Sequence, residues 1–215
     1  MSSLLAADLM PPGPGTLSDL VPAMGQALTG GGPAGLGLPD ATRYVFLLVD
    51  GMGQENLEHF RHLAPTLSEM KNCHDLTCYV PSTTATSLSC IGTGAVPGCH
   101  GVVGYTFRAP SGRVMNALSW VNGDDPEVIQ PHPTVFESLV AADDVDERVY
   151  KTLKASRSGD ASLTYVYERS LDHVGHGEGW QSAAWRSRLM WVDELVGALL
   201  DELDPGTALV VTADH

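Results

Sequence analysis

Three short runs of apolar residues dominate the hydrophobic pattern of this chain. The runs are Tyr44–Val49, Ser162–Tyr167 and Ala208–Thr212. Each is nearly continuous rather than alternating, as is typical of parallel strands that are covered on both faces. Between the second and third runs, Trp185–Leu203 repeats apolar residues every three to four positions. This spacing predicts an amphipathic helix that ends before Pro205.

Weaker patterns predict shorter elements elsewhere. Helices are expected over Leu17–Leu28, over Glu55–Met70 with a break near Pro65, over Thr83–Ile91 and over Glu147–Ala155, and a short strand over Thr77–Val80. Residues 1–40 are rich in Pro and Gly, so they are predicted to form an irregular leader around the first helix, followed by one folded domain over residues 41–215. The alternation of apolar strands with helices predicts an α/β fold with a mostly parallel sheet.

Composition and charge exclude several classes of protein. With 43% hydrophobic residues over 215 positions, the chain can bury a sizeable core and is too apolar to be disordered. Its formal net charge of -14 repels phosphate backbones, which argues against binding to nucleic-acid polymers. The chain has neither a membrane-length apolar run nor a basic, apolar leader, so we expect no membrane contact and a cytoplasmic location.

Carboxylates follow all three of the predicted buried strands. Asp50 and Asp214 come directly at strand ends, and Asp172 follows a short polar connection. The carboxyl ends of parallel strands meet at one edge of a sheet, where clustered negative charges are costly unless cations neutralise them. His176, four residues after Asp172, and His215 add nitrogen ligands. Mixed Asp and His ligands predict a divalent-metal site, with zinc favoured over manganese.

Hydroxyl groups gather at another predicted junction between a strand and a helix, in Pro81–Ser87. Taken alone, such a segment is typical of a helix N-cap. Beside metal ions, a threonine there is also a candidate nucleophile, since the helix N-terminus favours a bound phosphate.

These motifs, in this order, resemble the type I phosphodiesterase and nucleotide pyrophosphatase family of the alkaline phosphatase superfamily. The matching segments are Val45–Met52, Pro81–Thr84 leading to Thr93-Gly94, Pro97–Gly101, Tyr165–His176 and Val210–His215. The resemblance implies a three-layer α/β sandwich of the alkaline phosphatase type, with helices on both faces of a mostly parallel sheet. It also implies that residues 41–215 form a metal-dependent catalytic domain.

The resemblance further implies a hydrolase of phosphodiester or pyrophosphate bonds, acting on a small nucleotide or phosphate-ester substrate. Thr84 aligns with the family's nucleophile, which forms a phosphothreonine intermediate, and Thr83 is the alternative if the alignment shifts by one residue. Two zinc ions are implied. One would be held by Asp50, Thr84, Asp214 and His215, and the other by Asp172 and His176.

The chain departs from the family pattern at three places. No histidine follows His215, although the family's second zinc takes one from a later segment. The connection after Thr134–Glu137 is short, and Tyr105 stands where many nucleotide pyrophosphatases have asparagine. The first two departures indicate a shortened member that is incomplete at its C-terminus. The third departure leaves the substrate class open. The alternatives are a phosphomonoesterase of the same superfamily and, because of the missing histidine, a catalytically impaired fragment that acts as a binding module.

The remaining candidates have structural interpretations. His100 is expected to stabilise a loop, and Trp185 to lie in the core. The acidic residues of the long helix, among them Asp193, are expected on its polar side. If later strands are missing, the strand around Val210 becomes a sheet edge, and we expect self-association through it.

Overall fold

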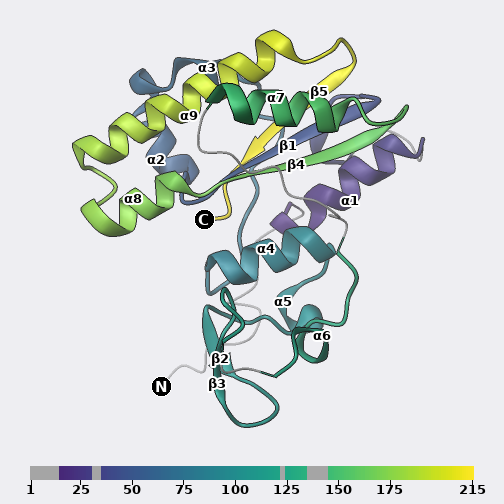
Figure 1. The fold of residues 1–215 in the computed structure, drawn as a ribbon, viewed down its shortest axis with the longest axis vertical. Helices are drawn as coiled ribbons and strands as arrows, with labels where there is room; N and C mark the ends of the chain where they lie inside the picture. The colour runs from purple at the N-terminus through teal and green to yellow at the C-terminus, as the bar shows by residue number, and fades with distance from the viewer. Residues whose placement is uncertain (1–14, 31–34, 122–123, 135–144) are drawn as a thin grey trace. The chain divides into compact units, whose positions relative to one another are not determined.

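A computed structural model of the chain describes residues 15–30, 35–121, 124–134 and 145–215 (Figure 1). The described residues form two compact units, one within residues 24–73 and 145–213 and the other within residues 15–23, 74–134 and 214–215. The first unit holds a parallel sheet flanked by helices, as the hydrophobic pattern predicts. No helix in the described ranges is long and apolar enough to cross a membrane.

The sheet has three parallel strands in the order β4-β1-β5. Strand β1 (Arg43–Val49) lies in the centre and is buried from Tyr44 onward, whereas β4 (Ser162–Glu168) and β5 (Thr207–Thr212) flank it. The three predicted strands are therefore confirmed. Within the described residues β5 pairs with β1 alone, and most of it is half-buried. Self-association through that edge stays a prediction.

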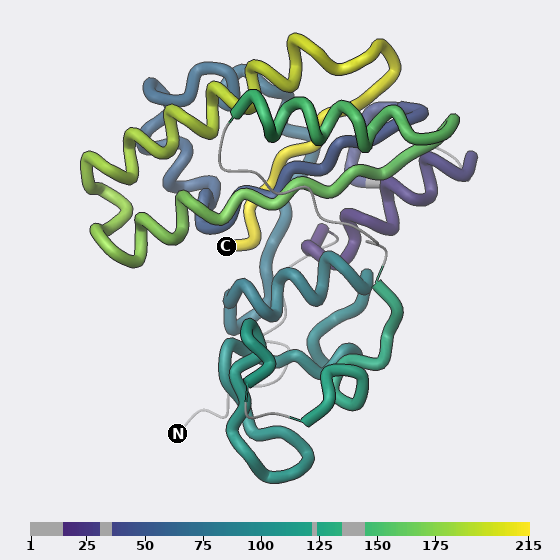
Figure 2. Tube along the Cα trace, viewed as in Figure 1, coloured from purple at the N-terminus to yellow at the C-terminus, as the bar shows by residue number. Residues whose placement is uncertain are grey.

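Helices cover one face of this sheet, and one of them carries the apolar stripe that the sequence predicts. Helix α9 (Ala183–Glu202) buries Leu189, Val192 and Leu195 against side chains of β1 and β4, and α7 (Val145–Ser156) packs beside it. Figure 2 shows both helices running across the same side of the strands. The remaining helices of this unit are α2 (Gln54–His59), η3 (Arg61–Leu63), α3 (Pro65–Glu69), α8 (Ser170–Glu178) and the short η2 (Gly35–Gly37). The helix predicted over Glu55–Met70 is thus divided into the three short helices α2, η3 and α3, and the predicted break near Pro65 lies between η3 and α3.

One residue of α9 was placed wrongly by the sequence pattern. Asp193 was expected on the polar side of the helix, but its side chain is buried, with 7% exposed. Its carboxylate accepts hydrogen bonds from the backbone N–H of Leu67 at 2.8 Å and of Thr66 at 3.3 Å. These are donors at the start of α3, which have no partner within that helix. Asp193 therefore caps α3 across 127 residues of sequence, while Trp185 lies in the core as predicted.

The other unit is built from short elements around a small core. It contains α4 (Thr84–Thr93), α5 (Pro97–His100), α6 (Pro126–Ile129) and an antiparallel hairpin of β2 (Thr106–Arg108) with β3 (Val114–Asn116). Its core includes Ala85, Val102, Met115 and Ile129. Helix α1 (Leu17–Leu28) begins in this unit with the predicted bounds.

The predicted strand over Thr77–Val80 is wrong. Only Thr77 makes a β-bridge, to Thr16, with its N–H donating to Gly15 at 3.0 Å and its carbonyl accepting from Leu17 at 3.2 Å. The pairing cannot extend because the partner segment enters α1 at Leu17. An apolar run without a neighbouring strand leaves its backbone groups unpaired, so it does not become a strand.

Candidate metal centre

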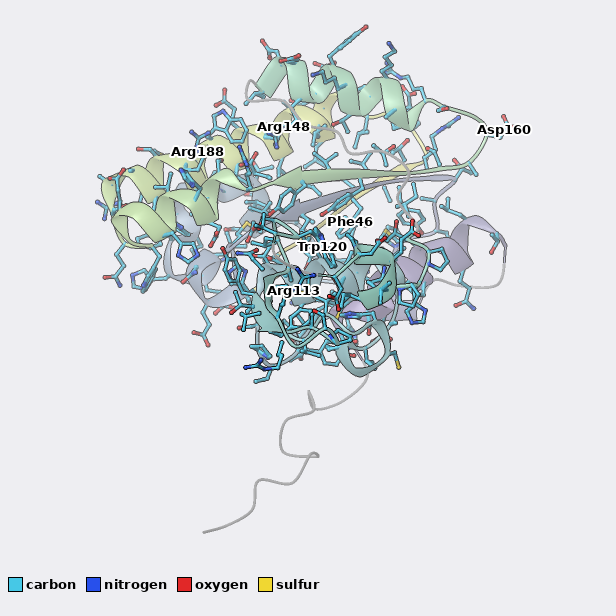
Figure 3. The ribbon with its side chains drawn as sticks, turned by 60° about the horizontal axis from the view of Figure 1, so that its bottom comes forward. Phe46, Arg113, Trp120, Arg148, Asp160 and Arg188 are labelled. Atoms are coloured by element: carbon cyan, nitrogen blue, oxygen red, sulfur yellow. The ribbon has the colours of Figure 1, made fainter. Side chains whose placement is uncertain are left out.

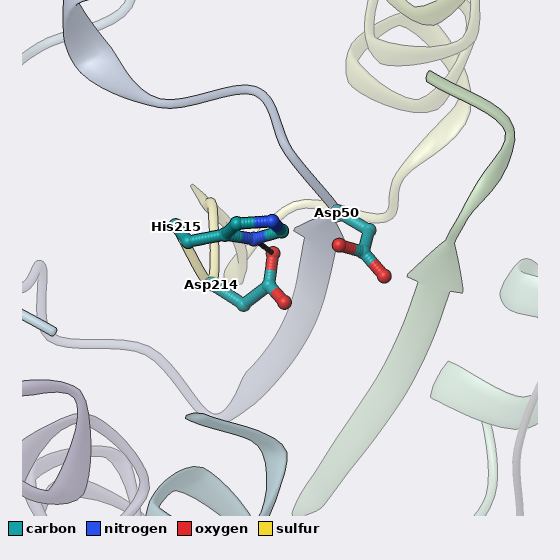
Figure 4. A group of neighbouring side chains, drawn as sticks. All are labelled: Asp50, Asp214 and His215. Carbon is teal, nitrogen blue, oxygen red and sulfur yellow. Dashed lines mark ion pairs between the residues drawn. The ribbon is translucent and has the colours of Figure 1, made fainter. Parts of the chain in front are cut away.

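The carboxyl ends of β1 and β5 bring three of the predicted ligands together. Leu48 is paired with Thr212, so Asp50 and Asp214 each follow by two residues at adjacent strand ends. One ligand atom from each of Asp50, Asp214 and His215 lies within 4.8 Å of the other two (Figure 4). The imidazole Nδ1 of His215 is 2.9 Å from Oδ1 of Asp214. Within the described ranges, this is the group of acidic, His and Cys side chains that has the spacing of a metal site.

The chemistry of this triad suits a divalent cation. Asp50 is 3% exposed and Asp214 is fully buried, so two carboxylates lie close together largely out of water. Such an arrangement is unfavourable unless a positive charge lies between or beside them. Two carboxylate oxygens with one imidazole nitrogen form a donor set that zinc accepts and that manganese tolerates. The residues present therefore fit the metal that the sequence implies.

Asp172 and His176 lie one turn apart on α8, with His176 Nε2 3.5 Å from Asp172 Oδ1. Asp172 also lies against the turn that follows Asp50. A Cβ on Gly51, whose φ is +71°, would be only 3.0 Å from the Asp172 side chain. Glycine at position 51 thus permits both the left-handed turn and the close approach of α8. The side chain of His176 is 80% exposed.

Thr84 is the first residue of α4, a helix that is tied to the segment carrying Asp214. Three residues after Thr84, the buried Ser87 hydroxyl donates a hydrogen bond of 2.8 Å to the backbone carbonyl of Asp214. The neighbouring Thr83 is the N-cap of α4, because its Oγ1 accepts from the N–H of Thr86 at 3.5 Å. Thr83 and Thr84 therefore have different structural positions, although the sequence left both open as nucleophiles.

Two polar residues at these strand ends, Tyr167 and Glu168, are not among the residues predicted from the sequence. The Tyr167 hydroxyl donates to Oδ2 of Asp50, and buried Glu168 accepts from Arg148 and from Ser170. Both residues belong to β4, which the sequence pattern predicts as an apolar strand. The strand register could have indicated Tyr167, since its partner Leu48 lies two residues before Asp50, on the same side of the strand.

His100 has the structural role expected of it. The side chain is fully buried, its Nδ1 accepts from the N–H of Val102 at 3.1 Å, and its Nε2 is 3.3 Å from Cys90 Sγ. Because Nδ1 is an acceptor, the neutral ring carries its proton on Nε2 and donates it towards the sulfur. Burial, with a smaller contribution from His132, lowers the pKa of His100 to about 4. Burial likewise raises the pKa of the Cys90 thiol to about 12.

The depressed pKa of His100 predicts a loss of stability in mild acid. Below pH 6.5 the unfolded chain takes up a proton that the folded chain accepts only near pH 4, so the free energy of unfolding falls as the pH falls through this window. The loss attributable to His100 approaches about 3 kcal/mol at pH 4. Urea unfolding of the wild type and of His100→Gln at several pH values measures it.

In that experiment the difference in stability between the two proteins should depend on pH between 6.5 and 4. Exposed His62 provides the control, and His62→Gln should keep the wild-type pH dependence. A His100→Gln protein whose stability falls with pH as steeply as that of the wild type would contradict the assignment.

Sequence comparison identifies the family of this chain. A sequence profile described as type I phosphodiesterase / nucleotide pyrophosphatase matches residues 44–145 and 136–215. The chain belongs to this family. The two matched segments contain Asp50 and Thr84 in the first, and Asp172, His176 and the Asp214-His215 pair in the second. A search of curated protein sequences gave no match.

Solved structures of one mouse member of the family have the same fold. Murine ectonucleotide pyrophosphatase/phosphodiesterase 5 superimposes with a TM-score of 0.63, and an inactive variant in complex with AMP superimposes with a TM-score of 0.61. In both comparisons the identity is 18%, and the match covers 80% of this chain and 56% of the mouse chain. The predicted α/β fold with a parallel sheet is thereby confirmed, and this family member spans about half the length of that relative.

Proposed function

We propose that this type I phosphodiesterase family member hydrolyses phosphodiester or pyrophosphate bonds in small nucleotides, with Thr84 as the nucleophile. The observation that carries the proposal is the meeting of Asp50, Asp214 and His215 at the end of the sheet. Ligands of α/β proteins bind at this end of the strands. The complex of the mouse relative with AMP supports a nucleotide as the substrate class.

Asp50, Asp214 and His215, together with the Thr84 hydroxyl, would hold one zinc ion, and Asp172 with His176 would hold a second. Bound zinc would supply Lewis-acid stabilisation of phosphate oxygens and lower the pKa of a coordinated hydroxyl. Two contacts within the chain hold these ligand residues in place. Ser87 ties α4 to the backbone of Asp214, and Gly51 lets Asp172 approach the turn after β1.

In the proposed reaction, the Thr84 oxygen attacks phosphorus and the leaving alcohol or phosphate departs on the opposite side. The product on the enzyme is a phosphothreonine ester that still carries the nucleoside, until water releases the nucleotide and restores the hydroxyl. The N-terminus of α4, where Thr84 lies, favours the negative charge of the phosphate. Thr84 is preferred over Thr83 because the Thr83 oxygen already caps α4.

Two alternative functions would use the same site residues. A phosphomonoesterase would use the same residues on a terminal phosphate. A catalytically impaired protein would bind nucleotides without turning them over. The exposed side chain of His176 favours the second alternative over the first, since a site of two ligands, one of them exposed, binds a metal weakly compared with the buried triad.

Metal removal and rates on matched substrates test the proposal. We expect about two zinc ions per purified chain and hydrolysis of p-nitrophenyl thymidine 5′-phosphate, a diester, faster than that of p-nitrophenyl phosphate, a monoester. Dialysis against a chelator should abolish the activity, and added zinc should restore it. Faster monoester hydrolysis would support the phosphomonoesterase. A zinc-loaded chain that binds nucleotide without turnover would support the binding module, and activity that survives chelation would contradict metal dependence.

A further inference from the structure

Asp50 has a fixed backbone position and a buried side chain. Its N–H donates to the carbonyl of Glu168 at 2.8 Å, which holds the end of β1 against β4. The turn at Gly51 then carries the chain away from the sheet. With the backbone fixed in this way, the direction of the carboxylate depends on its side-chain torsions and on the groups that bond to it.

Tyr167 is one such group. It lies on β4 opposite Leu48, two residues before Asp50, so its side chain shares a face of the sheet with that of Leu48. From there its hydroxyl donates a hydrogen bond to Oδ2 of Asp50. In Figure 4 one carboxylate oxygen of Asp50 points towards Asp214 and His215, and the other points away from them, towards β4.

A row of aromatic rings fixes the phenol itself. The Tyr167 ring stacks on that of Tyr165, with centroids 6.4 Å apart, and Tyr165 packs on Phe46 of β1 at 5.4 Å. Tyr167 is half-buried, and Phe46, at the other end of the row, is fully buried. Because the ring has little freedom, its hydroxyl is held at one point beside Asp50.

We propose that Tyr167 is a positioning residue that sets the orientation of Asp50 for metal binding. The inference rests on the proposed function, since it requires Asp50 to be a metal ligand. A hydrogen bond from a rigid donor to one carboxylate oxygen directs the other oxygen towards Asp214 and His215 before a cation arrives. Partners of this kind typically change metal affinity by about 10- to 100-fold when they are removed.

Competition between the protein and a chromophoric chelator for Zn²⁺ tests the inference without relying on activity. The variant is Tyr167→Phe, which removes only the hydroxyl and keeps the ring in the aromatic row. We expect its dissociation constant for the more tightly bound zinc to rise by about tenfold or more. Tyr165→Phe is the matched control, because Tyr165 lies on the same face of the same strand, and its zinc affinity should stay within twofold of the wild type.

A second comparison shows whether Tyr167 acts through Asp50. In an Asp172→Asn background, which leaves Asp50 intact, Tyr167→Phe should weaken zinc binding by the same factor as in the wild type. In an Asp50→Asn background the factor should fall towards one. Circular dichroism and thermal unfolding of each variant verify that the affinities refer to folded protein.

The outcomes separate this inference from the proposed function. A wild-type chain that binds no Zn²⁺ overturns both. A wild-type chain that binds Zn²⁺, with Tyr167→Phe binding it equally well or more tightly, overturns only the role of Tyr167, and tighter binding would mean that the phenol competes with the metal for Asp50. Loss of the native fold in Tyr167→Phe but not in Tyr165→Phe would overturn the inference in favour of a purely structural role.

Discussion

Replacing Thr84 by alanine is expected to lower kcat for p-nitrophenyl thymidine 5′-phosphate by roughly a thousandfold or more, because the step that forms the covalent ester loses its nucleophile. Stability should change little, since Thr84 follows the N-cap and alanine is well tolerated in the first turn of a helix. Acid quenching of the wild type during turnover, followed by mass spectrometry, should find the nucleotidyl group on the peptide that contains Thr84.

Two neighbouring hydroxyl groups serve as controls for Thr84→Ala. Ser82 is exposed in the same segment, and Ser82→Ala should keep the wild-type rate. Thr83→Ala should cost about 1 kcal/mol of stability through loss of the cap, with most of kcat retained. If Thr83→Ala abolishes turnover and Thr84→Ala does not, the nucleophile is one residue earlier, and if neither variant affects kcat the covalent mechanism is wrong.

Replacing Arg148 by methionine is expected to reduce the free energy of unfolding by about 3–5 kcal/mol. The Arg148 guanidinium lies 2.5 Å from Glu168 Oε2, and both side chains are more than nine-tenths buried. It also donates to the carbonyl of Tyr167 at 3.1 Å and lies over the ring of Trp191. Figure 3 labels Arg148 on α7 and Arg188, which lies over the same ring, on α9. Without Arg148, a buried carboxylate would lose its counter-charge.

A double-mutant cycle measured by urea unfolding separates the ion pair from packing. The double variant Arg148→Met with Glu168→Gln should recover part of the loss, because no uncompensated charge remains in the core. The exposed pair of Lys151 with Glu147, 2.8 Å apart on the same helix, is the matched control. Lys151→Met should cost less than about 1 kcal/mol. Equal losses for Arg148→Met and Lys151→Met would contradict the assigned role of the buried pair.

The apolar runs predicted the parts of the fold that depend on local sequence. Tyr44–Val49 becomes the buried central strand, and the stripe of α9 becomes the face that covers it. The candidate metal centre was also partly predictable. Parallel strands end at the same edge, so the acidic residues after β1 and β5 meet there once the two strands are neighbours, as they are in the order β4-β1-β5.

Partners far apart in the sequence were not predictable in this way. Asp193 is expected with the other acidic residues on the polar side of α9, yet its carboxylate caps α3. Thr77–Val80 has the composition of a strand, but the segment beside it turns into α1 after one bridge. In both cases the outcome depends on whether a polar group finds a hydrogen-bond partner. That partner is distant in the sequence, so the local pattern of residues does not indicate it.

The sequence by itself determined the family, through the order of its motifs, and the buried strands with the carboxylates and imidazoles that follow them, through its apolar runs. Both signals are local, because each is carried by residues that are neighbours along the chain. Only the tertiary structure decided that Glu168 pairs with Arg148, that Gly51 admits Asp172, and that Tyr167 bonds to Asp50. Those contacts depend on register and on the close approach of neighbouring elements, and a change of one residue in register would remove each of them.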